Sequence, residues 1–199
     1  MNTQEEATLV DLLPPNSVLA RSKEPLVPTR SDEPLSICEI NRNTGELLGC
    51  AVEFTLSLVE TESYEEGLIQ YSQLRLSKGK ESKILHYIHY TGWKDSKTIT
   101  VGNMKKLLEI VNKYQKGNAI FMNCLMGQGR TGTFDLAKRI KETGKAFFET
   151  PVPREDNNPI AHHIEKSRTV RCKMVDHESQ FFFLHELANI IWEELYGRD

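Results

Sequence analysis

The sequence has no long apolar segment and no large excess of charge. None of its apolar runs approaches the roughly 20 residues that a helix needs to cross a bilayer, and its first residues lack a basic head followed by an apolar stretch. The net charge at pH 7 is −3, unlike the polycation that binds nucleic acid. We therefore expect no membrane span and no nucleic-acid partner. The sequence does not indicate the oligomeric state.

Cysteine is scarce and shows no paired spacing. The four cysteines are Cys38, Cys50, Cys124 and Cys172, and no CxxC pair is present. This usage favours a reducing compartment, which we expect to be the cytoplasm. A reactive thiolate would also need such a compartment to stay active.

The six histidines form no pattern that suggests a metal site. His86 and His89 are three apart on a predicted strand, so their side chains point to opposite faces. His162 and His163 are adjacent and diverge on a predicted helix. We therefore expect no metal and no cofactor.

The first 35 residues differ in composition from the rest of the chain. They are polar and contain Pro14, Pro15, Pro25, Pro28 and Pro34, which interrupt any long periodic pattern. We predict an N-terminal tail over residues 1–35, in which Leu9, Val10, Leu12 and Leu13 could dock as a short turn. Residues 36–199 are predicted to form one domain, because a chain of this length can bury a substantial core.

Residues 36–199 show alternating and helical patterns together, which predicts an α/β protein. The predicted strands cover residues 36–41, 50–61, 68–76, 83–90 and 118–122. The predicted helices cover residues 101–115, 131–143, 160–166 and a long segment after residue 180. Turn residues at 43–45 and 77–82 indicate local antiparallel pairing. Residues 145–158 contain prolines and adjacent asparagines, which predicts a connecting loop.

The stretch NCLMGQGRTGTF, residues 123–134, has the features of an anion-binding loop. Cys124 follows a predicted strand, and Arg130 comes six residues later, where a helical pattern begins. Backbone N–H groups of such a turn can surround an anion, and the helix that follows adds its positive dipole end. Arginine can grip two phosphate oxygens at once. The same surroundings lower the pKa of a cysteine, so Cys124 is a candidate nucleophile toward phosphorus.

This stretch resembles the active-site signature of the cysteine-based protein tyrosine phosphatases. The family pattern is His-Cys, five residues, Arg, Ser or Thr, then Gly, and only the histidine is replaced, by Asn123. The resemblance implies that Cys124 is the nucleophile, with Asn123 as its supporting neighbour, and that Thr131 eases departure of the thiolate. It also implies that the phosphate is held by the loop residues Leu125, Met126, Gly127, Gln128, Gly129 and Arg130.

The segment Trp93-Lys94-Asp95 resembles the Trp-Pro-Asp loop of the same family. The tryptophan and the aspartate match, while Lys94 stands in place of the proline. The resemblance implies that Asp95 is the general acid and that Trp93 supports its loop. Proline fixes φ near −65°, so its absence predicts a less restricted loop backbone.

Residues 168–180 resemble the family region in which two arginines precede a loop that positions water. Arg168 and Arg171 match the arginines, and Gln180 matches the second glutamine. The first glutamine position falls on Asp176, and a position often occupied by glycine falls on Lys173. We expect the two arginines to support the phosphate loop as structural ion-pair residues and Gln180 to orient the attacking water.

Taken together, the resemblance implies a shortened catalytic domain of the tyrosine-specific branch over residues 36–199. The implied fold is a central twisted mixed β-sheet flanked by helices. The implied function is hydrolysis of phosphotyrosine in proteins through a cysteinyl-phosphate intermediate. Two alternatives stay open: a phosphotyrosine-binding domain with impaired catalysis, favoured by Asn123, Lys94 and Asp176, and a phosphatase of broader specificity. The family's upstream aromatic loop has no clear counterpart, which supports the second alternative.

Overall fold

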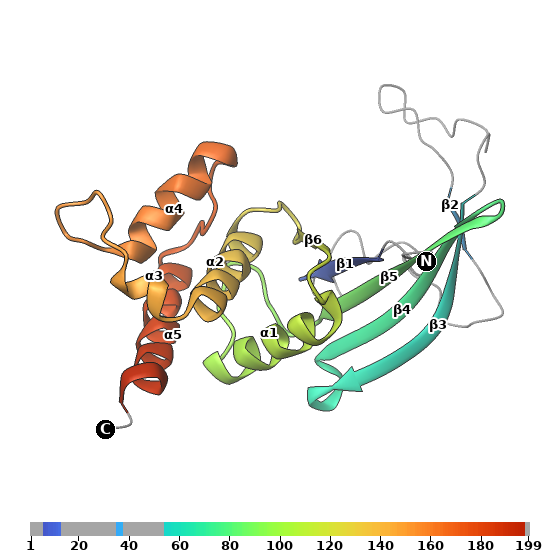
Figure 1. Ribbon diagram of the computed structural model, residues 1–199, viewed down its shortest axis with the longest axis horizontal. Helices are drawn as coiled ribbons and strands as arrows, with labels where there is room; N and C mark the ends of the chain where they lie inside the picture. Colours follow the sequence, from blue (N-terminus) through green and yellow to red (C-terminus); the bar gives the residue numbers. More distant parts are fainter. Residues whose placement is uncertain (1–5, 13–34, 38–53, 198–199) are drawn as a thin grey trace. The chain divides into compact units, whose positions relative to one another are not determined.

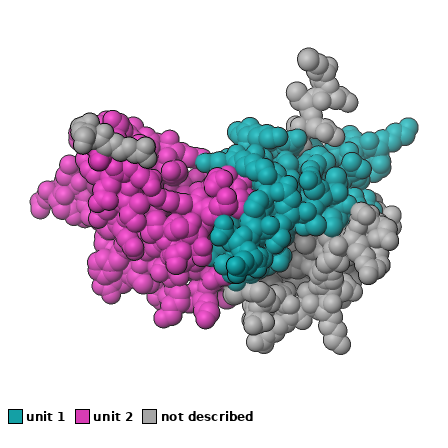
Figure 2. Space-filling model, turned by 90° about the horizontal axis from the view of Figure 1, so that it is seen from below, with its two compact units in different colours: residues 1–11, 15–91, 111–121 teal, residues 12–14, 92–110, 122–199 magenta. Residues whose placement is uncertain are grey.

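The computed structural model describes residues 6–12, 35–37 and 54–197. The chain divides into two compact units, coloured separately in Figure 2. Unit 1 comprises residues 1–11, 15–91 and 111–121, and unit 2 comprises residues 12–14, 92–110 and 122–199. Among the described residues, no helix has both the length and the apolar content that crossing a membrane requires.

A mixed β-sheet dominates unit 1 (Figure 1), with the strand order β2-β3-β4-β5-β1-β6. The strands are β1 (Glu6–Asp11), β2 (Leu35–Ile37), β3 (Phe54–Tyr64), β4 (Ile69–Lys78), β5 (Glu81–Tyr90) and β6 (Ala119–Asn123). Strands β2 to β5 pair antiparallel, and β1 pairs parallel with β5. The predicted antiparallel pairing is therefore confirmed, whereas the predicted turn at 43–45 lies outside the described residues, as do Cys38 and Cys50.

One face of the sheet carries an apolar cluster that follows from strict alternation along the strands. Leu56, Leu74 and Tyr87 are buried at its centre. The register places Leu74 opposite Leu85 and Leu58 opposite Leu74, so alternate residues of neighbouring strands meet on the same face. The turn between β4 and β5 contains Gly79 with φ +58°, which confirms the predicted turn in residues 77–82.

Strand β1 corrects the prediction of a tail over residues 1–35. It lies between β5 and β6, with Val10 opposite Ile88, and Val10 and Leu12 are fully buried. Six residues are too few to show a clear alternation beside a proline-rich stretch, and interior strands are recognised mainly by their partners. The prediction is wrong for residues 6–12, and residues 13–34 lie outside the described part.

The helices are α1 (Val101–Gln115), α2 (Gly129–Thr143), α3 (Lys145–Glu149), α4 (Pro159–Val170) and α5 (Glu178–Tyr196). Helix α1 has the predicted bounds: the Thr100 hydroxyl accepts a hydrogen bond from the Asn103 N–H at its start, and Gly117 follows its end with φ +83°. Within unit 2, α2 contacts α3, α4 and α5. The buried face of α2 includes Phe134, Ala137 and Ile140, as the helical periodicity predicts.

Two predictions in the C-terminal region need correction. The segment 145–158 is not entirely a loop, because its first five residues form α3, where Phe147 is buried. Helix α4 is longer than the predicted range 160–166: Asn158 caps its start by accepting a hydrogen bond from the Ala161 N–H, and the helix continues to Val170. Polar residues dominate its last turn, so the apolar periodicity ends before the helix does.

Candidate active site

The candidate phosphate loop runs from Cys124 to Arg130, between β6 and α2. Gly127 has φ +61°, and a Cβ atom there would lie 3.1 Å from Arg171 Nη2. Glycine avoids backbone strain at this φ and leaves space for the Arg171 guanidinium. The first turn of α2 contains no acidic residue, so the positive end of its dipole faces the loop uncompensated.

The Cys124 thiol is buried and receives several hydrogen bonds. Thr131 Oγ1 donates to Cys124 Sγ at 3.2 Å. Burial alone raises the pKa of the thiol, but the Thr131 hydroxyl, the N–H groups of Thr131 and Gln128, and the charge of Arg130 together hold it below its ordinary value. These surroundings agree with the predicted direction of the Cys124 pKa shift.

Main-chain carbonyls orient the Arg130 guanidinium, which is 3% exposed. Nη1 donates to Leu12 O at 3.1 Å and to Trp93 O at 3.0 Å. Both N–H groups of Nη1 are thereby used, so the edge formed by Nε and Nη2 is the part that can grip an anion. The Leu12 N–H also donates to Asn123 O at 3.0 Å, which ties the same residue to the end of β6.

Asp95 faces Arg130 across the candidate site. Its Oδ1 lies 3.2 Å from Arg130 Nη2, and its side chain is 72% exposed. Trp93 is fully buried and donates from Nε1 to Lys97 O at 2.8 Å, which anchors the segment that carries Asp95. An ion pair with one exposed partner contributes only about 0–1 kcal/mol, so an entering phosphate can displace the carboxylate from Nη2 at little cost.

The loop before α5 brings Gln180, Asp176 and His177 to the phosphate loop. Gln180 is buried, and its Oε1 accepts a hydrogen bond from the His177 N–H at 3.4 Å. A Cβ atom on Gly129 would lie 3.0 Å from Gln180 Oε1 and 3.5 Å from Asp176 Cβ. Both side chains therefore lie directly against the start of α2.

Among the described residues, the predicted supporting arginines Arg168 and Arg171 bind backbone carbonyls and not the carboxylates expected for ion pairs. Arg171 Nη2 donates to Met126 O at 2.7 Å and so holds the phosphate loop. Arg168 donates from Nε to Met174 O at 3.0 Å and from Nη2 to Val175 O at 2.7 Å. Arg171 thus contacts the loop directly, whereas Arg168 holds the segment before α5.

Most of the predicted site residues line one cavity of about 100 Å³. It is lined by Asp95, Ser96, Cys124, Met126, Gln128, Gly129, Arg130, Asp176, His177 and Gln180. The predicted site residues that do not line it are Leu125, Gly127, Thr131, Trp93 and Asn123. Thr131 donates a hydrogen bond to the sulfur, and Trp93 and Asn123 accept hydrogen bonds through their main-chain carbonyls. Leu125 is exposed. In the described part of the chain, no three His, Cys, Asp or Glu side chains gather as metal ligands.

Sequence reasoning missed three contributors to this site. Ser96 and His177 line the cavity, and each directly follows a predicted site residue, which was the available signal. Leu12 contributes through its carbonyl oxygen, and a main-chain atom leaves no signature in the sequence.

The model of the protein-tyrosine phosphatase family, described as "Protein-tyrosine phosphatase", matches residues 45–189. The chain belongs to this family. Tyrosine-protein phosphatase 2 of Schizosaccharomyces pombe is 25% identical over 138 residues, which cover 68% of this chain and 19% of the relative. The chain thus spans about a fifth of the length of that curated relative.

Solved structures show the same fold. The protein tyrosine phosphatase TbPTP1 of Trypanosoma brucei matches with a TM-score of 0.73 at 16% identity, over 95% of this chain and 61% of that one. PTPN18, solved in complex with HER2 phosphopeptides, matches with a TM-score of 0.72 at 18% identity, over 94% of this chain and 63% of that one. The predicted family and the predicted α/β fold are therefore confirmed. The roles of individual residues stay predictions.

Proposed function

We propose that the protein is a tyrosine phosphatase that hydrolyses phosphotyrosine in proteins through a cysteinyl-phosphate intermediate. The observation that carries this proposal is the Cys124 thiol, whose pKa is held below its ordinary value in the cavity that Arg130 and Asp95 also line. A thiolate, a fixed guanidinium and a carboxylic acid are the groups that metal-free transfer of a phosphoryl group to sulfur requires.

In the first step, the Cys124 thiolate attacks phosphorus and the bond to the phenolic oxygen breaks. The Nε and Nη2 edge of Arg130 and the N–H groups of residues 125–130 hold the phosphate oxygens as charge develops on them. Asp95 donates its proton to the departing oxygen. The exposed pairing of Asp95 with Arg130 supports this role, because the carboxyl group is free to turn toward the leaving group once phosphate occupies Nη2.

In the second step, a water molecule attacks the phosphorus of the cysteinyl-phosphate and the bond to sulfur breaks. Gln180 orients the water, and Asp95 accepts its proton. The Thr131 hydroxyl, 3.2 Å from the sulfur, stabilises the thiolate that departs. Asp176 stands where the family pattern has a glutamine, so we expect the rate of this step to differ from that of a typical member.

The names of the relatives support a phosphotyrosine substrate. The curated relative is a tyrosine-protein phosphatase, and PTPN18 has been solved with HER2 phosphopeptides. We also propose a reducing compartment such as the cytoplasm as the place of action, because an active thiolate must stay reduced.

A phosphotyrosine-binding function without turnover is the second candidate. The observation that favours it is the pair of departures from the family pattern at Lys94, beside the proposed acid, and at Asp176, where a glutamine is expected. Asn123 in place of the histidine points the same way, since it carries no charge to support the thiolate. The presence of the nucleophile, the arginine and the acid together favours the enzyme.

Hydrolysis of a simple aryl phosphate by the purified protein tests the proposal. We expect turnover that Cys124→Ser abolishes, because the serine hydroxyl ionises far less readily than the thiol. Cys172→Ser is the matched control: it makes the same change at an exposed thiol that does not line the cavity, and it should retain activity. Residual activity of Cys124→Ser near that of the wild type would overturn the assignment. A wild type that binds phosphotyrosine peptides without turnover would establish the binding function.

A further inference from the structure

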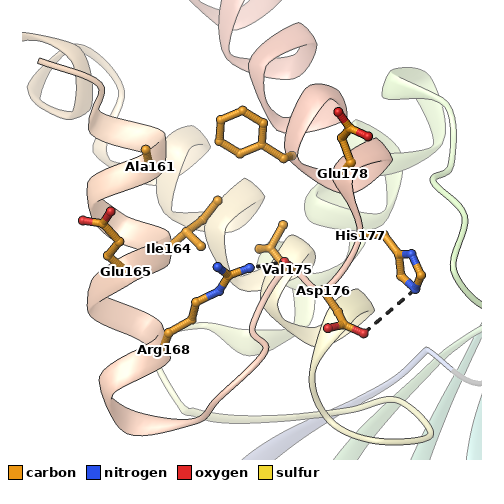
Figure 3. Close-up of a pocket in the computed structure, with 9 residues that line it drawn as sticks. Ala161, Ile164, Glu165, Arg168, Val175, Asp176, His177 and Glu178 are labelled. Carbon is orange, nitrogen blue, oxygen red and sulfur yellow. Dashed lines mark hydrogen bonds and ion pairs between the residues drawn. The ribbon is translucent and has the colours of Figure 1, made fainter. Parts of the chain in front are cut away.

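A second cavity, of about 280 Å³, lies between α4 and α5 (Figure 3). It is lined by Ala161, Ile164, Glu165, Arg168, Val175, Asp176, His177, Glu178 and Phe181. Figure 3 shows residues of α4 on one side and Glu178 of α5 on the other, with Val175, Asp176 and His177 on the connecting segment. The proposed catalytic steps use no residue of α4.

Apolar side chains form part of the wall of this second cavity. Ile164 and Val175 are buried, and Phe181 adds an aromatic ring that packs edge to face on His185 with ring centroids 4.6 Å apart. Such a surface can contact the aliphatic part of a side chain, and an aromatic ring can also attract a cation. The cavity is smaller than most pockets for drug-sized ligands, which begin at roughly 300 Å³, so its size suits one amino-acid side chain.

The charged groups around the apolar surface favour a cation. Three carboxylates, those of Glu165, Asp176 and Glu178, face one guanidinium, that of Arg168. Two donors of Arg168 are already used by carbonyl oxygens, which reduces its capacity to hold an anion. Glu165 is paired with Arg154, whereas within the described part of the chain no basic side chain pairs with Glu178. A ligand with a positive end would therefore find an uncompensated carboxylate here.

The second cavity shares part of its wall with the candidate active site. Asp176 and His177 line both. A peptide whose phosphotyrosine enters the first cavity therefore has neighbouring side chains within reach of the second. This continuity identifies the ligand as a part of the same substrate.

We propose that the second cavity binds a lysine or arginine side chain that flanks the phosphotyrosine of the substrate. The aliphatic stem of that side chain lies on Ile164 and Phe181, and its charged end pairs with Glu178 and Asp176. The preferred substrates are therefore phosphotyrosine peptides with a basic residue next to the phosphorylated one. This inference rests on the proposed function for the identity of the peptide, but the cavity can be tested separately from turnover.

The test compares phosphotyrosine peptides that differ only in carrying Lys or Glu at one flanking position, with each position scanned in turn. Binding is measured by fluorescence anisotropy on the Cys124→Ser protein, so that turnover is not needed. At one position we expect the Lys peptide to bind about fivefold more tightly than the Glu peptide, the upper end for a partly exposed ion pair. The difference should fall as salt is raised.

Three variants locate the source of the preference. Glu178→Lys should abolish or reverse it, and Ala161→Phe, which fills the cavity without changing charge, should also abolish it. Glu186→Lys is the matched control, because it makes the same charge change on α5 at an exposed residue that does not line the cavity. With Cys124 intact, Glu178→Lys should hydrolyse a simple aryl phosphate at the wild-type rate.

Each remaining outcome decides against the proposal or separates it from the proposed function. Equal binding of the Lys and Glu peptides, or equal loss of preference in Glu178→Lys and Glu186→Lys, would overturn the cavity assignment while aryl phosphate turnover still supports the phosphatase. Tighter binding of the Glu peptide would identify Arg168 as the governing group and overturn it as well. A Lys preference without any turnover would support the cavity and refute the phosphatase.

Discussion

At the scale of single residues, the reactivity of Cys124 depends on a small number of groups that favour ionisation of its thiol. Burial raises the pKa of the thiol. A hydroxyl, two backbone N–H groups and one guanidinium lower it, and together they outweigh burial. Hydrogen bonds to a charged acceptor contribute about 1.5–3 kcal/mol each, more than a charge pair near the surface. The Thr131 hydroxyl is therefore the side chain whose loss should change the reactivity of the thiol most directly.

Thr131→Val should raise the pKa of Cys124 toward its ordinary value. Valine has the same shape but no O–H donor, so the thiolate loses stabilisation and the thiol form does not. Alkylation of Cys124 by iodoacetamide, followed against pH, should show its midpoint moved to higher pH. Below that midpoint the rate should fall about tenfold, the factor that corresponds to about 1.4 kcal/mol.

The control for this measurement is Thr143→Val, the same change at the other end of α2, where the hydroxyl donates to Arg139 O at 2.7 Å. It should leave the alkylation profile unchanged. A wild-type profile with the midpoint of a free thiol, near about 8.5, would show that the hydrogen bonds do not act on the sulfur as the geometry indicates.

At the scale of elements, helix α2 approaches the segment before α5 more closely than side chains would allow. A Cβ atom on Gly132 would lie 2.6 Å from Val175 N and 3.1 Å from Met174 Cα. These are backbone atoms of a segment that Arg168 holds, so they cannot move aside as a flexible side chain would. Glycine at this position therefore sets the distance between α2 and the residues that bring Asp176 and Gln180 to the site.

Gly132→Ala should lower the free energy of unfolding by about 1–3 kcal/mol, the usual cost of overpacking. It should also slow aryl phosphate turnover, because the segment that carries Asp176 must shift. Chemical denaturation measures the first effect. Gly102→Ala on α1 is the control: its Cβ atom would meet only Thr100 Oγ1, at 3.9 Å, and alanine favours a helix, so stability should be unchanged or higher. Equal effects of the two substitutions would contradict the close approach.

The elements themselves were predictable to different degrees. Helix α1 has the predicted bounds because a capping threonine, an apolar periodicity and a following glycine all lie within its own sequence. Helix α3 was missed because five residues carry too little periodicity to distinguish a helix from a loop. Strand β1 was missed because its burial depends on β5 and β6, which lie far away in sequence.

At the scale of the whole molecule, the N-terminal segment contributes both to the sheet and to the site. Within unit 1, β1 lies between two other strands, and within unit 2, Leu12 holds Arg130 and Asn123. Val10 and Leu12 are fully buried, and each such side chain contributes about 1.5–3 kcal/mol through burial. That sum is a large part of the 5–15 kcal/mol that stabilises an ordinary domain.

Deletion of residues 1–12 should therefore prevent cooperative folding or lower the melting temperature sharply, and it should abolish aryl phosphate turnover. The physical reason is the loss of an interior strand and of the Leu12 carbonyl, one of the two that orient Arg130. A thermal melt followed by circular dichroism measures the first effect. Deletion of residues 1–5 alone is the control and should leave both properties unchanged, since it retains β1. Equal melting of the two truncated proteins would contradict the interior position of β1.

The sequence alone was enough to recognise the family, to locate the candidate phosphate loop and to predict the direction of the Cys124 pKa shift. Each of these depends on residues close together in the chain, because Gln128, Arg130 and Thr131 lie within seven residues of the sulfur that they stabilise. Local geometry is enough to bring such groups together.

Tertiary packing sets the orientation of Arg130, the side chains that reach the loop and the position of the second cavity. Arg130 is held by carbonyl groups of Leu12 and Trp93, which any residue could provide, so the sequence carries no sign of them. The second cavity is lined by residues of α4, of α5 and of the segment between them. Such features depend on the packing of distant segments, and packing is a property of the folded chain, not of any short stretch of sequence.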